Sequence, residues 1–376
     1  MQNDAPDTMG DEEREAWFDE FLRQPTTLPE DLDITCTNFA DQADAQKTAD
    51  VVRVHLTIFG RLMDLNGLAQ VFLTFDYPGT LAKLDRGFPA KNVLQPTNDD
   101  IAEGVAMAPS VKRDGFWKSV IVLNARYARA LSYEPEPSFP DVEGLRKLKA
   151  QVVHILAHEC GHVHDLAIKV KSIPQETLEK AWNRKEFILM GTANACWDEY
   201  IASRLSACYG NEETLEGLES SFVARLELAW PVITKSIRLY RMHGNVGRVL
   251  NEVALEIRKV LVYASYLLGH LAGLELLLAD GAPKATAALK QSAEFAPFIE
   301  RLQTECETIY AQYDKLPNLD VFDSLAELVQ DVFQCAGLAI TQDGDNTHVA
   351  IPHREDTMPS FSEQAEFMQQ RIHGAI

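Results

Sequence analysis

The feature that most constrains this chain is a segment near its middle that reads as one long helix with a dense group of polar side chains. In residues 142–170 apolar side chains recur at helical spacing, with Leu145, Leu148 and Val152 on one stripe. The stretch HILAHECGHVHD, residues 154–165, lies in the same segment and holds four histidines, a glutamate, a cysteine and an aspartate. So many polar groups make a poor buried surface unless something pairs them. The segment therefore predicts a helix with a functional face.

Within this stretch the residues from His158 to His162 form the pattern H-E-x-x-H. Positions i and i+4 of a helix lie one turn apart on the same face, so the two histidines can converge on a single zinc ion. Glu159 projects close to that face and can take a proton from a zinc-activated water that attacks a carbonyl. A chance H-E-x-x-H would occur in roughly one chain of this composition in fifty. Its place in a segment that is helical on independent grounds favours a metal site.

The composition limits the partners of the chain. Its 376 residues carry 56 acidic and 35 basic side chains, a formal charge of -21. Nucleic acid and anionic lipid both require a basic face, so we expect neither as a partner. The most apolar segment, 260–279, contains His270 and Glu275 and lacks basic flanks, which predicts a buried helix and no membrane span. A start without a secretory signal and six scattered cysteines predict a cytoplasmic protein with reduced thiols.

An α+β fold follows from the order of the expected elements. Residues 1–49 read as an acidic leader that we expect to be mobile. Residues 50–170 read as a subdomain whose small, mainly antiparallel sheet packs on the H-E-x-x-H helix. Four strands are expected in it, at residues 51–59, 71–75, 104–108 and 119–125. The first strand rests on the alternation of apolar and polar residues in VVRVHLTIF.

A large helical half follows the motif. Residues 171–340 show long helical patterns and form the expected helical subdomain. Its helices are expected at residues 186–209, 213–242, 246–279, 292–315 and 320–338. Residues 341–376 read as a hairpin around Asp343 and Gly344, followed by a tail that can hold one short helix.

The small sheet, the H-E-x-x-H helix and the helical half together resemble the zincin superfamily of metallopeptidases. The pattern is similar to the branch in which a glutamate from a later helix completes the zinc site. It departs from the metzincin extension of the motif, because Asp165 stands where that extension has glycine. The resemblance implies a zinc-dependent peptidase that has Glu159 as its general base and acts on a peptide or protein.

Glu199 is the best candidate for the third zinc ligand. Ser203 and Ser206, one and two turns further along the same helix, carry small side chains that let a second helix come close. Asp198 is the nearest rival. Asp165 is another, because it follows the histidines at helical spacing, but it lies about 10.5 Å along the helix axis from the first of them.

The zincin resemblance also implies a donor for the oxyanion of the transition state. Tyr200, beside the expected ligand, and His270, in a stripe with two tyrosines at helical spacing, are the candidates. A tyrosine stripe is more often a sign of core packing than of catalysis. The remaining polar residues of the motif stretch, His154, Cys160 and His164, read as surroundings of the site. The favoured function is a zinc peptidase; the alternative is a zincin-like sensor or regulatory protein that binds a protein partner with little or no turnover.

Overall fold

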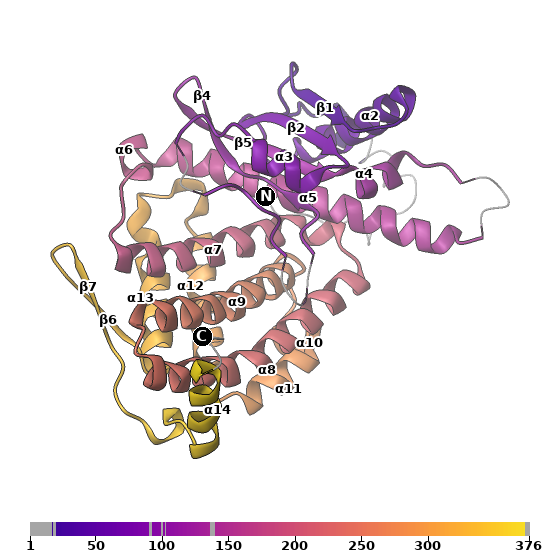
Figure 1. The fold of residues 1–376 in the computed structure, drawn as a ribbon. Coiled ribbons are helices and arrows are strands. Elements are labelled where there is room, and N and C mark those ends of the chain that lie inside the picture. The colour runs from indigo at the N-terminus through magenta and orange to yellow at the C-terminus, as the bar shows by residue number, and fades with distance from the viewer. Residues whose placement is uncertain are drawn as a thin grey trace. The chain divides into compact units, whose positions relative to one another are not determined.

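The structure, a computed structural model, describes Trp17 and residues 20–89, 92–98, 101, 103–135 and 140–372. It is an α+β fold, as the sequence predicts, with a small sheet and many helices (Figure 1). The chain divides into two compact units. The first comprises residues 1–97 and 103–168, and the second comprises residues 98–102 and 169–376.

The first unit is built on a mixed sheet with the strand order β1-β2-β5-β3, in which β4 also pairs with β5. β1 and β2 are parallel, and so are β2 and β5, whereas β3 and β4 run antiparallel to β5. The expectation of a mainly antiparallel sheet is therefore wrong, because the two longest ladders are parallel. The strands are β1 (Asp33–Thr37), β2 (Leu68–Thr74), β3 (Ala106–Met107), β4 (Ser110–Arg113) and β5 (Phe116–Asn124).

The helix α2 (Gln42–Phe59) explains the parallel pairing of β1 and β2. The strand expected at residues 51–59 is wrong, because those residues form the second half of α2. Asp41 caps the helix, and Val52 and Leu56, one turn apart, are buried on the same stripe. The alternation in this segment is a local coincidence among β-branched residues. Parallel strands need a crossover connection, and α2 supplies it between β1 and β2.

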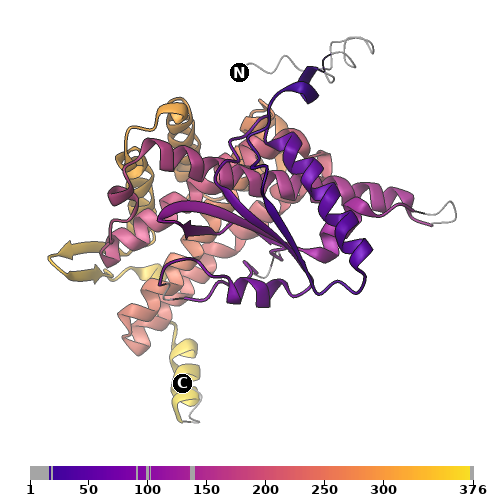
Figure 2. The same cartoon turned by 90° about the horizontal axis from the view of Figure 1, so that it is seen from above.

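Regular structure starts inside the leader expected at residues 1–49. Phe21 is already buried, β1 forms the edge of the sheet, and α2 begins before residue 50. Figure 2 shows α2 running alongside the strands. The acidic start of the chain, residues 1–16 together with 18 and 19, lies outside the described residues.

Alternate residues of the central strand β5 face different layers. Val120 and Val122 share one apolar cluster with Val111 of β4 and with Tyr77 and Leu81. The last two residues belong to a short helix that follows β2. Figures 1 and 2 show the longest helix of the unit beneath the strands. The short helix is α3 (Tyr77–Lys83), and the longest helix is α5 (Val142–Ser172). A further helix, α4 (Ala125–Ser132), lies between them in the chain.

The second unit is mainly helical, and its long helices confirm the predicted ones to within a few residues at most ends. The helix expected at 246–279 stops earlier, at Gly273, and Glu275 beyond it adopts a left-handed backbone with φ of 58°. The long helices are α7 (Arg184–Ser206), α8 (Glu212–His243), α9 (Val246–Gly273), α12 (Ala296–Tyr310) and α13 (Asp323–Cys335).

Shorter elements connect and extend these helices. The predicted hairpin is confirmed, and its turn uses Gly344, with φ of 52°. The short elements are α6 (Gln175–Leu178), η2 (Ala207–Tyr209), α10 (Leu278–Gly281), α11 (Pro283–Gln291), η3 (Tyr313–Lys315), η4 (Leu319–Phe322), β6 (Ala339–Asp343), β7 (Asn346–Ala350), η5 (Glu355–Thr357) and α14 (Phe361–Ile372).

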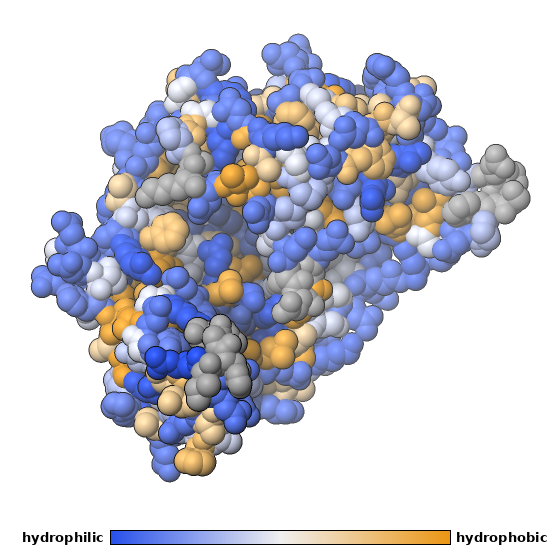
Figure 3. All heavy atoms as spheres, viewed as in Figure 1, coloured by the Kyte–Doolittle hydropathy of each residue, from blue (hydrophilic) through white to orange (hydrophobic). Residues whose placement is uncertain are grey.

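The face seen in Figure 3 is mostly hydrophilic, with apolar side chains in small groups. Within the described part of the chain, no helix combines the length and the apolar character that a membrane span requires.

Candidate metal centre

The motif lies on α5, a helix of 31 residues. Acidic Glu143 in its first turn and basic Lys169 in its last turn complement the helix dipole. His158 and His162 are one turn apart, and their ring centroids are separated by 4.8 Å. The two imidazoles therefore lie together on one face of the helix, as the spacing predicts.

Glu159, between these histidines in sequence, is buried, with 7% of its surface exposed. Its negative charge affects the pKa of the cysteine that follows it. Burial raises the pKa of the neighbouring Cys160 thiol far above its ordinary value, and the negative charge of Glu159 raises it further. Cys160 thus stays a neutral, inert thiol inside the motif, as expected for a buried cysteine.

Glu199 is carried by α7. This helix starts at a capping box in which Asn183 and Glu186 each accept from the backbone N–H of the other. Ser203 and Ser206, the small residues beyond Glu199, are both buried. The small-residue face that singled out Glu199 in the sequence is therefore a packed face of α7.

The structure brings the three expected ligands together. One ligand atom from each of His158, His162 and Glu199 lies within 4.8 Å of the other two, and none of the three side chains is exposed. Ligand atoms around a tetrahedral zinc ion are about 3.4 Å apart, given bonds of about 2.0–2.1 Å. Two imidazoles and one carboxylate are also the donor set of catalytic zinc sites that keep a fourth position open. The three residues could therefore hold a metal ion, and their chemistry suits zinc.

The rival carboxylates have different surroundings. Asp198 Oδ1 accepts a hydrogen bond from Lys169 Nζ at 2.6 Å, in an ion pair that engages this carboxylate. Asp165 is buried on α5, and it is not a member of the ligand group.

Tyr200 and His270, the oxyanion donors suggested by the zincin resemblance, have packing roles in the second unit. The Tyr200 hydroxyl donates to Glu307 Oε1 at 2.7 Å and accepts from Arg204 Nη1 at 2.7 Å, so it is already engaged. His270 is fully buried, and its ring lies so close to Gly210 that an added Cβ there would meet it at 2.6 Å. These contacts do not support the donor role of either residue.

The surrounding histidine His164 has a structural contact. Its Nδ1 accepts a hydrogen bond of 2.7 Å from the backbone N–H of Asp64, which fixes its neutral tautomer with the proton on Nε2. This bond ties α5 to the loop that precedes β2.

Tyr77 is a residue that the sequence analysis missed. It opens α3, directly after β2, and 3% of its surface is exposed. Its hydroxyl is buried and has no hydrogen-bond partner among the described residues. Burial raises the pKa of Tyr77 above its ordinary value, and the charge of Glu159 raises it further. Only the motif FDYPG, a helix start with Asp76 as its cap, marks this position in the sequence.

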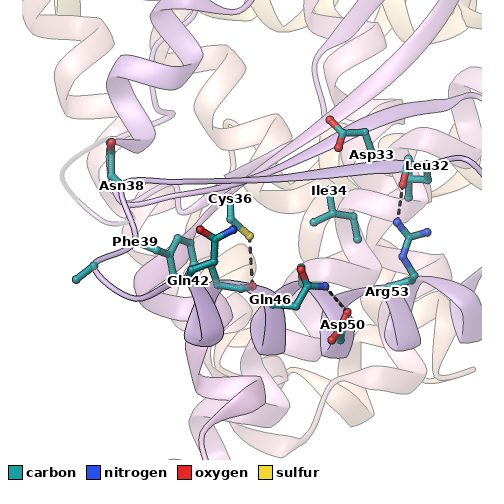
Figure 4. A pocket seen from close by; sticks show the side chains of 13 residues that line it. Leu32, Asp33, Ile34, Cys36, Asn38, Phe39, Gln42, Gln46, Asp50 and Arg53 are labelled. Atoms are coloured by element: carbon teal, nitrogen blue, oxygen red, sulfur yellow. Dashed lines mark hydrogen bonds between the residues drawn. The ribbon is translucent and has the colours of Figure 1, made fainter.

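A separate cavity of about 570 Å³ lies between β1 and α2 (Figure 4). Several of its polar side chains are engaged: Arg53 donates to the carbonyl of Leu32, and Gln46 donates to Asp50. The Cys36 thiol donates to the carbonyl of Ala45 at 3.4 Å. The cavity is not lined by any residue of the motif. The hydrogen bonds of Arg53, Gln46 and Cys36 engage polar groups that would otherwise face a ligand.

No family model, curated protein or solved structure matches the chain. The function is therefore inferred from the residues of the chain itself.

Proposed function

We propose that the chain is a zinc-dependent, zincin-like metallopeptidase. The observation that carries the proposal is the convergence of His158, His162 and Glu199 within 4.8 Å. Three protein ligands of this chemistry leave a fourth position open, which is typical of catalytic zinc sites and not of structural ones. Zinc, when bound, supplies Lewis-acid activation of water and polarisation of a carbonyl.

Glu159 has the properties of the general base. It is adjacent to the first ligand, and its burial keeps its carboxylate out of bulk water. In the proposed reaction Glu159 takes a proton from water as the water oxygen bonds to the scissile carbonyl carbon. The C–N bond then breaks, and Glu159 returns the proton to the leaving amine. Water is consumed, and a carboxyl and an amino terminus are formed.

The sheet supports a peptide as the substrate. β1 lies at one end of the strand order and β3 at the other. The backbone groups of an edge strand can pair with an extended peptide, which adds as a further strand. Such pairing holds the substrate through its backbone groups, so it tolerates many different side chains in the substrate.

The first test is the zinc content of the purified protein. We expect about one zinc per chain in the wild type and a large loss in His158→Ala and in Glu199→Ala. Glu227→Ala, on α8, is the control and keeps its zinc. Undiminished zinc in Glu199→Ala would contradict the ligand set.

The second test is peptide cleavage by Glu159→Gln. This variant keeps the shape and the metal ligands, so it retains zinc, but kcat falls by about 10²–10⁴. Mass spectrometry of a peptide library reports the cleavage. Wild-type protein that holds zinc, cleaves nothing and captures a stable protein partner would favour the sensor or regulatory alternative.

A further inference from the structure

One face of α5 carries more than the two zinc-ligand histidines. A residue advances about 100° around a helix, so a separation of eleven residues returns to within about 20° of the starting direction. His158, His162 and Lys169 stand at i, i+4 and i+11. The lysine therefore lies on the same face as both histidines, about two turns beyond the second one.

Lys169 is a poorly exposed cation with defined partners. Its side chain is 12% exposed, and its Nζ is 2.6 Å from Asp198 Oδ1. The same ammonium group lies 5.3 Å from the centroid of the Phe322 ring, a cation–π contact. The Asp198 side chain is 40% exposed, so the lysine is the shielded end of the pair. Removal of Asp198 would leave this poorly solvated cation without its counter-charge.

Asp198 directly precedes Glu199 on α7. Adjacent residues of a helix differ by about 100° in direction and 1.5 Å in height. A contact that holds Asp198 therefore restrains the rotation of α7 about its axis and its position along that axis. Distances to a metal tolerate errors of about 0.2 Å, far less than a slip of one residue.

We propose that the ion pair between Lys169 and Asp198 positions Glu199 as the third metal ligand. The proposal rests on the proposed metal site. Lys169 acts through α7, so it is a positioning residue. The pair also neutralises the charge of Asp198, the carboxylate nearest in sequence to Glu199. Glu199, and not Asp198, then binds the ion.

The test is zinc affinity, measured by competition with a chelator. Lys169→Met and Asp198→Asn should each weaken zinc binding by about 10–100-fold, the usual cost of losing a residue that supports a ligand. The double variant should be no weaker than the worse single variant, because both changes remove one interaction. Lys169→Arg keeps the charge and should remain within a few-fold of the wild type. Asp198→Asn keeps the side-chain shape, so its folding is the least disturbed.

Lys259→Met is the matched control. It breaks a comparable pair with Glu256, at 2.9 Å, on the neighbouring helix α9. This variant should lose stability but keep the zinc affinity of the wild type.

The outcomes separate the two proposals. Unchanged affinity in Lys169→Met and Asp198→Asn, with zinc lost in Glu199→Ala, overturns the positioning role and leaves the metal site standing. A rise in affinity in Lys169→Met also overturns it, because the lysine would then be withholding Asp198 from the metal. A wild type that binds no zinc overturns both proposals.

Discussion

Tyr77 belongs to the apolar cluster of the first unit, and the charge of Glu159 acts on its hydroxyl group. The hydroxyl is buried, and no described residue accepts its hydrogen. A buried polar group without a partner costs about 1–3 kcal/mol, which a purely structural role would not require. Phenylalanine would fill the same space among Leu81, Val120 and Val122 without that cost. The hydroxyl is therefore a candidate donor to the oxygen on which charge develops during the proposed reaction.

Tyr77→Phe should leave the fold at least as stable as the wild type and should retain zinc. If the hydroxyl donates to the reacting oxygen, kcat should fall by about 10²–10³, the cost of losing one oxyanion donor. Thermal melting and peptide cleavage measure the two effects separately. Tyr133→Phe is the control, because this tyrosine of the same unit is 43% exposed. Full activity in Tyr77→Phe would refute the donor role.

The site residues differ in how far the sequence reveals them. His158 and His162 are spaced by one helical turn, so local geometry is enough to pair them. Glu199 is a candidate because small residues follow it on one face, which is again a local pattern. Tyr77 cannot be found this way. Its place near Glu159 depends on the sheet and on the turn after β2, and neither leaves a periodic signal.

The helices α7 and α9 approach each other unusually closely through two glycines of α9. A Cβ at Gly269 would lie 2.2 Å from the carbonyl oxygen of Tyr200, and one at Gly273 would lie 2.3 Å from that of Arg204. These glycines are four residues apart, so they lie on one face. The contact fixes the turn of α7 that follows Glu199.

Gly269→Ala should destabilise the protein by about 1–3 kcal/mol, because the added methyl group can be accommodated only if the helices move apart. Urea unfolding measures this change. Gly217→Ala on α8 is the matched control, since nothing lies within 4 Å of its added Cβ. There the higher helix propensity of alanine should stabilise the protein by up to about 1 kcal/mol. Equal effects of the two substitutions would contradict the close contact.

Long helices are predictable from this sequence, and the strands expected at 71–75, 104–108 and 119–125 overlap β2, β3 and β5, but the strand expected at 51–59 is wrong. α8 is expected at 213–242 and found at Glu212–His243, because its apolar stripe repeats over many turns. The error at 51–59 arises because these nine residues fit both the strand period and the helix period. The cap at Asp41 and the buried stripe that runs along α2 from Thr48 to Phe59 decide for the helix. That error also hides the parallel pairing of β1 and β2, because α2 is the crossover between these two strands.

Metal binding should be visible in the stability of the whole molecule. A ligand that binds the folded state alone raises the free energy of unfolding by about 2.7 kcal/mol at 100 times its Kd. Urea unfolding with saturating zinc and with a chelator measures this difference. Glu199→Ala should show almost none of it. A midpoint that the chelator leaves unchanged in the wild type would contradict a folded-state zinc site.

Buried thiols should make the protein sensitive to alkaline pH. Burial raises the pKa of Cys196 from 9.0 to about 12, and the unfolded chain has no such shift. The folded state therefore holds this proton more tightly, and the resulting stability is present below pH 9 and lost as the pH rises towards 12. Cys196→Ala should reduce the fall in unfolding free energy between pH 9 and pH 11. An identical fall in both proteins would show that other groups cause it.

The boundary between the two compact units falls inside α5, after Ile168, and not in a loop. Domains that evolution exchanges are usually joined by exposed linkers, where a gene can be cut without damage. A cut at this boundary would remove Lys169 from the helix that carries His158 and His162. It would also leave the last carbonyls of the shortened helix without partners. The two units are thus not interchangeable modules. A gene fusion that gave the first unit a new helical half would have to bring the last turn of α5 with it.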